Sequence, residues 1–261
     1  VSVRVGARVA PRTGVRKLRR PVATSSPSFN PLTGWTTDPV HGVWASDPLW
    51  TPPADGGAVS SWRNGGSVAG VDLTQATGSK QPTYRASTAA FNNQPTVQGD
   101  GTDDWIGATF GAAIASYPWY VVSIFSKGKA ANAPEVIWDD VPGSGGSPGY
   151  PLYTDTGAST WRISVAAELA GGTADTGTHL AVATYNGASS SLVIDGTSVS
   201  SGTTGAWHYA SGVTLCGGRG GTYNSSGHMA YWALFTTDPT ALPEWAAFKA
   251  WVTSTYGITV A

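Results

Sequence analysis

Residues 179–201 read HLAVATYNGASSSLVIDGTSVSS, and this stretch decides the fold. Three runs that favour β-strands are separated by Asn186-Gly187 and Asp195-Gly196. Both dipeptides readily adopt the positive φ angles of type I′ turns, which join neighbouring antiparallel strands. We therefore predict a three-stranded antiparallel meander. Leu192 and Ile194 should point to one face of it, and the residue between them to the other.

The rest of the chain also has the character of a β-protein. Its 261 residues include 34 Gly, 17 Pro and 12 Trp, and only 12% are charged. Such a composition suits short strands joined by tight turns around an aromatic core. WYVVSIF, residues 119–125, predicts a strand buried on both faces, and Asp100-Gly101 predicts a further turn. LPEWAAFKAWVTSTYG, residues 242–257, predicts a C-terminal helix with Pro243 in its first turn and Gly257 as its stop.

The N-terminal segment differs in charge from everything that follows it. Residues 1–22 carry seven cations and no acidic residue. These cations are Arg4, Arg8, Arg12, Arg16, Lys17, Arg19 and Arg20. Eight cations and 16 acidic residues are left for the remainder, a net charge of about −8. Pro11 and two glycines interrupt any helix, so we predict an extended docking arm that is ordered against an acidic partner. Residues 23–34 are rich in Pro and Ser and predict a linker to a body of residues 35–261.

Some classes of protein are excluded by what the chain lacks. A single cysteine, Cys216, excludes an internal disulfide framework and a Cys-rich zinc site. The most apolar stretch, residues 119–125, is much shorter than the ~20 residues of a membrane-spanning helix. We therefore expect no insertion into a membrane.

Several motifs resemble a known family. WASDPLW (44–50), VDLTQATGSKQPTY (71–84) and FNNQPTVQGDGTDDWI (91–106) resemble the opening of a concanavalin A-like, laminin-G-like jelly roll, in the version found in virion proteins of tailed bacteriophages. The meander at 179–201 and GHMAYWALFTTDPTALPEW (227–245) resemble its central and closing parts. The resemblance implies an all-β, two-sheet antiparallel jelly-roll sandwich with one C-terminal helix and a glycan-recognition heritage. Lectins, glycanases and structural modules all share this fold, so the fold alone does not give the function.

Catalytic residues are not evident. Glycanases of this kind carry alternating acidic residues, and retaining hydrolysis needs two carboxyl groups ~5–5.5 Å apart. The chain's glutamates, Glu135, Glu168 and Glu244, have no acidic neighbour two positions away. GGSPG at 145–149 fits G-x-S-x-G but lies in a Gly/Pro-rich run rather than between a strand and a helix. The sequence therefore predicts that the chain is not an enzyme.

Two kinds of binding site remain open. Asp100, Asp103 and Asp104 could supply hard oxygen ligands to calcium, although the alternative is that Asp100 shapes a turn and the others are solvated. We expect no cofactor, with calcium as the one exception considered. Sugar rings stack on exposed aromatic side chains. The candidates for such a glycan contact are Tyr150, Tyr153, Trp161, Trp207, Tyr209 and Tyr223.

The leading prediction is a structural virion protein of a phage, a minor tail or tail-tip component. Its arm would bind other virion proteins, and its body could contact host surface glycans. We expect it in multiple symmetric copies on the surface of the extracellular particle, after assembly in the host cytoplasm. The alternatives are a capsid decoration protein of the same fold and a free carbohydrate-binding lectin module. Nucleic-acid binding through the arm is disfavoured, because no aromatic residues are interleaved with its cations.

Overall fold

A computed structural model of the chain describes residues 29–67, 71–114, 118–129, 134–139, 151–155, 159–164, 167–204, 210–218 and 223–261. The predicted arm, residues 1–22, lies outside these ranges. So do three of the predicted glycan contacts, Tyr150, Trp207 and Tyr209.

The described residues form two antiparallel sheets of eight strands each. Sheet A consists of β1 (His41–Trp44), β4 (Thr83–Thr88), β5 (Gln94–Gln98), β7 (Trp119–Ser126), β12 (Thr178–Tyr185), β13 (Ser190–Ile194), β14 (Thr197–Gly202) and β16 (His228–Phe235). Its order is β14–β13–β12–β7–β16–β5–β4, with β1 also paired to β16. Sheet B consists of β2 (Ser61–Trp62), β3 (Leu73–Thr74), β6 (Ile106–Ile114), β8 (Glu135–Asp139), β9 (Leu152–Thr154), β10 (Trp161–Ser164), β11 (Glu168–Gly171) and β15 (Ala210–Leu215). Its order is β11–β10–β9–β8–β15–β6–β3–β2.

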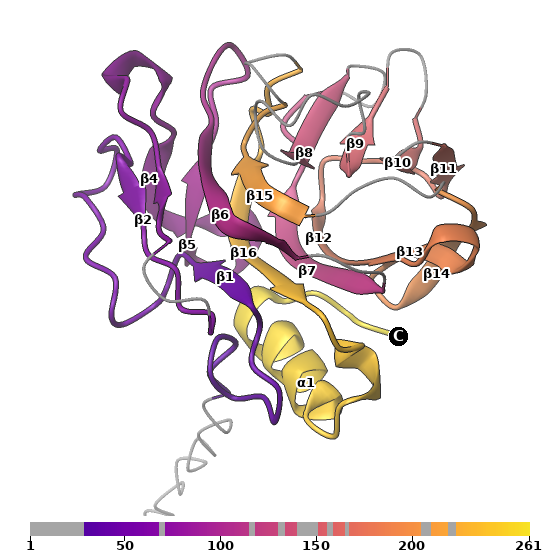
Figure 1. The fold of residues 1–261 in the computed structure, drawn as a ribbon. Helices are drawn as coiled ribbons and strands as arrows, with labels where there is room; N and C mark the ends of the chain where they lie inside the picture. The colour runs from indigo at the N-terminus through magenta and orange to yellow at the C-terminus, as the bar shows by residue number, and fades with distance from the viewer. Residues whose placement is uncertain are drawn as a thin grey trace, which may run out of the picture.

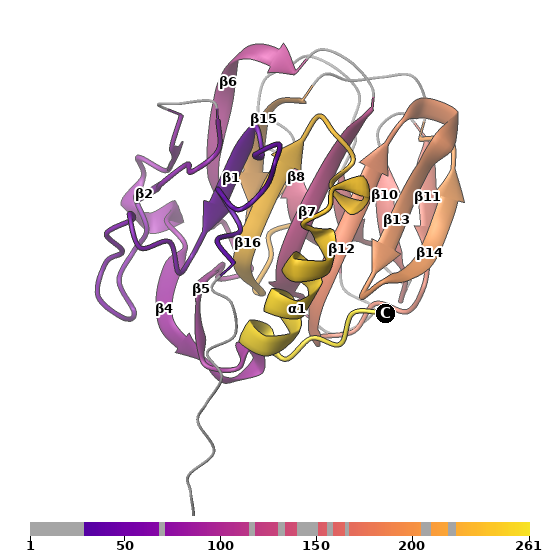
Figure 2. The same ribbon diagram turned by 90° about the horizontal axis from the view of Figure 1, so that it is seen from below.

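Helix α1 (Trp245–Tyr256) forms a third layer on the outer face of sheet A (Figures 1 and 2). Its buried residues Phe248, Trp251 and Val252 join a core cluster with the outward-facing side chains of β7, β12 and β16. Gly257 ends the helix at φ 74°, a left-handed conformation in which glycine carries no Cβ penalty. Among the described residues, no helix is long and apolar enough to cross a bilayer.

The main core lies between the two sheets and is rich in tryptophan. Its largest fully buried side chains include Trp62, Trp161 and Trp232. Every residue of β7 is buried, as the sequence predicts for a strand covered on both sides. The fold class is confirmed: the chain is an all-β, two-sheet antiparallel sandwich with a C-terminal helix.

The predicted meander is confirmed as β12, β13 and β14. Leu192 and Ile194 point into the inter-sheet core, and Val193 packs on the helix side. Asp195 and Gly196 have φ angles of 52° and 83°, as a type I′ turn requires.

The turn predicted at Asn186-Gly187 is wrong. Asn186 has a φ of −147°, and a short 3₁₀ helix, Gly187–Ser189, connects β12 to β13. The hydroxyl of Ser190 explains the longer connection. It accepts from the backbone N–H of Asn186 at 3.0 Å and donates to the carbonyl of Gly187 at 3.0 Å. These bonds satisfy backbone groups of the connection that would otherwise lack a partner within it.

Residues 29–34, the described part of the predicted linker, pack against the helix side of the domain. Leu32 is 2% exposed, and the carbonyl of Pro31 accepts hydrogen bonds from Tyr231 Oη and Trp35 Nε1, both at 2.9 Å. The ring of Phe29 lies 5.8 Å from that of Phe248 on α1. The chain therefore enters the described structure beside α1, on the outer face of sheet A.

Candidate functional site

The outer face of sheet B is the side of the sandwich away from α1 (Figure 1). It is buried along β8, and its outward-facing side chains reach solvent at β10 and β11. On β10, Trp161 and Ile163 enter the inter-sheet core. Because neighbouring side chains of a strand alternate between faces, Arg162 points outward. Tyr153 on β9 pairs in register with Arg162. Glu168 begins β11, where Leu169 packs against the core, so Glu168 also faces outward.

These strands bring together a set of interacting polar side chains, which we call the polar cluster: Tyr153, Asp155, Arg162 and Glu168. Arg162 Nη1 donates to Glu168 Oε1 and lies 3.7 Å from Asp155 Oδ2. Tyr153 Oη donates to the other oxygen of Glu168. The side chains of Arg162, Glu168 and Asp155 are 18%, 38% and 50% exposed. The cluster is therefore held by its own contacts and is still reachable from solvent.

Electrostatics fix the charges of the polar cluster near neutral pH. The hydrogen bond from Arg162 lowers the pKa of Glu168. The same bond raises the pKa of Arg162. Burial, followed by the hydrogen bond to Glu168, raises the pKa of Tyr153. The cluster thus presents the carboxylate of Glu168 as an acceptor beside the guanidinium of Arg162 as a donor. Such neighbouring donors and acceptors match the hydroxyl groups of a polyhydroxylated ligand.

The described aromatic candidates have different surroundings. Tyr153 belongs to the polar cluster. Tyr223 is 48% exposed, and its carbonyl accepts from the N–H of Val136, the residue of β8 that pairs with Tyr153. The prediction for Trp161 is wrong, because this side chain is 1% exposed and packs inside the core, so no sugar ring can reach it.

Sequence reasoning did not select Asp155, Arg162 or Glu168 as binding residues. The only signal was the alternation in WRIS and ELAG, residues 161–164 and 168–171, between apolar and other side chains. That alternation separates the two faces of each strand. It does not say which strands are neighbours, and the cluster depends on that pairing.

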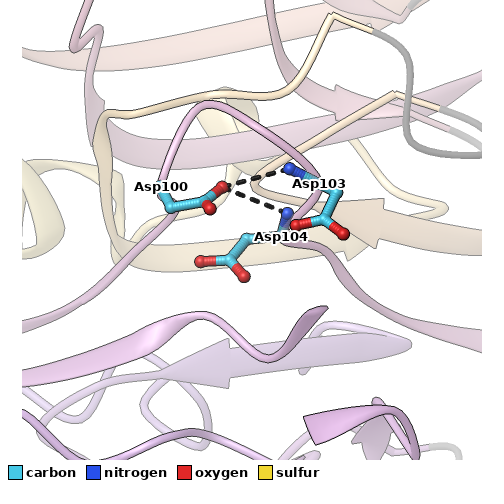
Figure 3. Close-up of side chains that lie close together, drawn as sticks. All are labelled: Asp100, Asp103 and Asp104. Carbon is cyan, nitrogen blue, oxygen red and sulfur yellow. Dashed lines mark hydrogen bonds between the residues drawn. The ribbon is translucent and has the colours of Figure 1, made fainter. Parts of the chain in front are cut away.

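The three predicted calcium ligands also lie together, in the connection between β5 and β6 (Figure 3). A ligand oxygen of each of Asp100, Asp103 and Asp104 lies within 4.8 Å of the others. Asp100 Oδ1 accepts from the backbone N–H groups of Thr102 at 2.7 Å, Asp103 at 3.2 Å and Asp104 at 3.3 Å. Asp100 therefore shapes the turn, and one of its oxygens is already occupied by these donors.

Asp104 is the unusual member of this acidic loop. It is 5% exposed. Burial, followed by the negative charge of Asp100, raises the pKa of Asp104 to about 6. The folded state therefore favours the protonated carboxyl more than the unfolded chain does. The stability that this preference provides is present below the unfolded pKa of about 3.9 and is lost as pH rises through about 6.

We expect Asp104→Asn to raise the free energy of unfolding by about 1–2 kcal/mol at pH 7.5, and to have almost no effect at pH 3.5. Urea denaturation at both pH values measures the difference. A Ca²⁺ ion held by the three carboxylates would stabilise the wild type and not the variant, so the series is repeated with calcium. Equal stability of the two proteins at pH 7.5 without calcium would contradict this description of the loop.

Comparison with known proteins shows which solved structures have a similar fold. No family model and no curated protein sequence matches the chain. Among solved structures, the chain is similar to Trypanosoma rangeli sialidase in complex with sialic acid, with a TM-score of 0.57 and 13% identity over 85% of this chain and 33% of that one. It is also similar to the same sialidase in complex with 2,3-difluorosialic acid, a covalent intermediate, with a TM-score of 0.56 and 16% identity over 85% and 34% of the two chains. The chain thus spans about a third of the length of these structures.

The comparison with solved structures corrects one prediction and supports another at the level of the fold only. The prediction that the chain is not an enzyme is overturned, because the structures that share its fold are sialidases, which are enzymes. The predicted jelly-roll resemblance is supported as a two-sheet β-sandwich fold, without its phage context. At this level of identity the likeness establishes the fold. The chain therefore has a two-sheet β-sandwich fold that it shares with part of these sialidase structures.

Proposed function

We propose that the chain recognises carbohydrate through the polar cluster on the outer face of sheet B, at its β9–β11 end. The observation that carries the proposal is the cluster itself: a tyrosine, a guanidinium and two carboxylates on an accessible sheet face. The similar sialidase structures are in complex with sialic acid and its difluoro analogue, which supports a sugar as the class of ligand.

Each residue of the polar cluster would make a different contact with the sugar. Asp155 and the remaining lone pairs of Glu168 accept hydrogen bonds from sugar hydroxyls. Arg162 donates to hydroxyl or carboxylate oxygens of the sugar. The ring of Tyr153 provides an apolar surface for the C–H face of a sugar ring. Because their mutual hydrogen bond lowers the pKa of Glu168 and raises that of Arg162, the contribution of this pair to binding should not change between about pH 5 and 9.

A glycan array with the full chain identifies a ligand, and isothermal titration calorimetry then compares variants. We expect Glu168→Gln and Arg162→Ala each to weaken binding at least about tenfold, because each removes a charge-assisted hydrogen-bonding group. Thr253→Ala is the matched control, since Thr253 is exposed on α1 at the opposite side of the sandwich. Mass spectrometry of the same mixtures records whether a bound glycan is cleaved. Unchanged affinity in both cluster variants would contradict the proposal.

A role in a virion is a second proposal, carried by the basic N-terminal segment and the family resemblance. The protein would be a minor tail, tail-tip or capsid decoration component held by residues 1–22. Phe29, the first described residue, packs on α1. This position supports attachment to the virion on the helix side and glycan contact on the other side of the sandwich. The polar cluster, on the other side of the sandwich, would then contact the glycan.

Deletion of residues 2–28 tests the role of the arm. We expect a folded, soluble body that binds glycan as the full chain does but is absent from purified particles. Particles that contain the truncated body at normal occupancy would contradict it.

A further inference from the structure

A cavity of about 500 Å³ lies beside β2, at the opposite edge of sheet B from β11. Its volume falls in the range of small-molecule sites, about 300–1,000 Å³. The residues that line it combine apolar, hydroxyl-bearing and charged side chains, among them Leu49, Trp50, Pro52, Ser61, Arg63 and Asp72. The cavity shares no residue with the polar cluster, so it is a separate candidate site.

The apolar part of the cavity is formed by Leu49 and Trp50. Leu49 is 72% exposed, so a ligand can cover its side chain. Trp50 is fixed in place, because its ring stacks on that of Trp62 at 5.7 Å and its Nε1 donates to the carbonyl of Ser61 at 3.2 Å. The lining thus includes a ring that is fixed in place and an exposed aliphatic side chain.

The polar part is held in position by a buried carboxylate. Asp47 is 6% exposed. Its Oδ1 accepts from the backbone N–H of Leu49 at 3.0 Å, and its Oδ2 accepts from Nη1 of Arg63. A guanidinium has five N–H donors, so Arg63 keeps donors for a ligand. Asp72 is exposed, and only its Oδ1 receives the backbone N–H of Asn64, at 2.9 Å. A site held in this way loses little entropy when a ligand binds.

We propose that this cavity binds the acetamido group of an N-acetylated sugar. An acetamido group carries one N–H donor, one carbonyl acceptor and one methyl group. Asp72 supplies the acceptor, Arg63 supplies the donor, and the exposed side chain of Leu49 supplies an apolar surface for the methyl group. The hydroxyl of Ser61 is available to the sugar ring. The inference rests on the proposed function in that both concern carbohydrate, but it uses different residues.

Saturation-transfer NMR on the full chain tests the inference with N-acetylglucosamine, glucose and N-acetylglycine methylamide. We expect the acetamido methyl protons of N-acetylglucosamine to receive the strongest saturation, and glucose to bind about tenfold more weakly. Asp72→Asn and Leu49→Ala should each weaken N-acetylglucosamine binding about fivefold to tenfold. Both residues are exposed, so neither change should affect folding.

Thr253→Ala, at an exposed residue of α1, is the control and should leave binding of N-acetylglucosamine unchanged. Glu168→Gln reports on the polar cluster, and under the inference Asp72→Asn and Leu49→Ala weaken binding of N-acetylglucosamine in the Glu168→Gln background as they do in the wild type. Loss of binding in Glu168→Gln, with none in Asp72→Asn or Leu49→Ala, would overturn the cavity as a site and leave the proposed function standing. The reverse pattern would support the cavity and count against the polar cluster. Equal binding of N-acetylglycine methylamide would overturn a sugar as the ligand, and absence of all binding would overturn the inference.

Discussion

Replacing Trp161 with alanine is expected to lower the free energy of unfolding by about 3–5 kcal/mol. The side chain is 1% exposed in the inter-sheet core, and its ring lies 5.4 Å from Phe125 and 5.3 Å from His179. Truncation would remove these contacts and leave a cavity that the rigid sheets cannot close. Urea denaturation followed by tryptophan fluorescence and circular dichroism measures the change.

Tyr223→Ala is the matched control for Trp161→Ala, because Tyr223 is an aromatic residue with 48% exposure. Its loss should change stability by no more than about 0.5 kcal/mol. A similarly small effect of Trp161→Ala would mean that β10 presents its other face to the core. A shift of one residue exchanges the two faces of a strand, so Arg162 would then point inward and the polar cluster would not exist.

The second large loss of stability is expected when Glu135 is replaced, because its carboxylate is fully buried. It accepts hydrogen bonds from the backbone N–H groups of Gly128 at 3.0 Å, Lys129 at 2.9 Å and Gly227 at 3.1 Å. It also accepts from the hydroxyl of Ser225 at 2.5 Å. One side chain thus ties the end of β7 to the segment that leads into β16.

Glu135→Ala should lower the free energy of unfolding by about 3–5 kcal/mol, because buried donors lose their acceptor. Lys127 adds to the loss of stability in Glu135→Ala. It is 1% exposed, burial lowers its pKa, and the negative charge of Glu135 opposes that shift. Glu168→Gln, at a partly exposed carboxylate, should cost no more than about 1 kcal/mol in the same denaturation experiment. Equal stability of the two variants would contradict the buried network.

The parts of the fold that depend on local chemistry could be predicted from the sequence. Alternating apolar residues and the Asp195-Gly196 turn are enough to define β12–β14. Pro243, the apolar stripe and Gly257 are enough to define the C-terminal helix to within a few residues. At Asn186-Gly187 the same reasoning failed, because a side-chain hydroxyl from Ser190 takes up the backbone groups of the turn.

The candidate site could be predicted only in part, because it depends on contacts between separate strands. Tyr153 was selected for its residue type, whereas Arg162 and Glu168 matter through their position beside it. Trp161 was selected by the same criterion as Tyr153 but lies on the opposite face of sheet B. With 12 tryptophans in the chain, residue type alone cannot separate a core ring from a binding ring. The acidic loop is different, since its three carboxylates are close in sequence and therefore close in space.

The central claim is that the polar cluster on the outer face of sheet B binds carbohydrate. The most direct measurement is a ¹⁵N–¹H correlation spectrum of the labelled full chain during titration with a glycan identified on the array. We predict chemical-shift changes at residues of β9, β10 and β11, including Tyr153, Arg162 and Glu168, and none along α1. Changes confined to α1 and the outer face of sheet A, with the polar cluster unaffected, would contradict the claim.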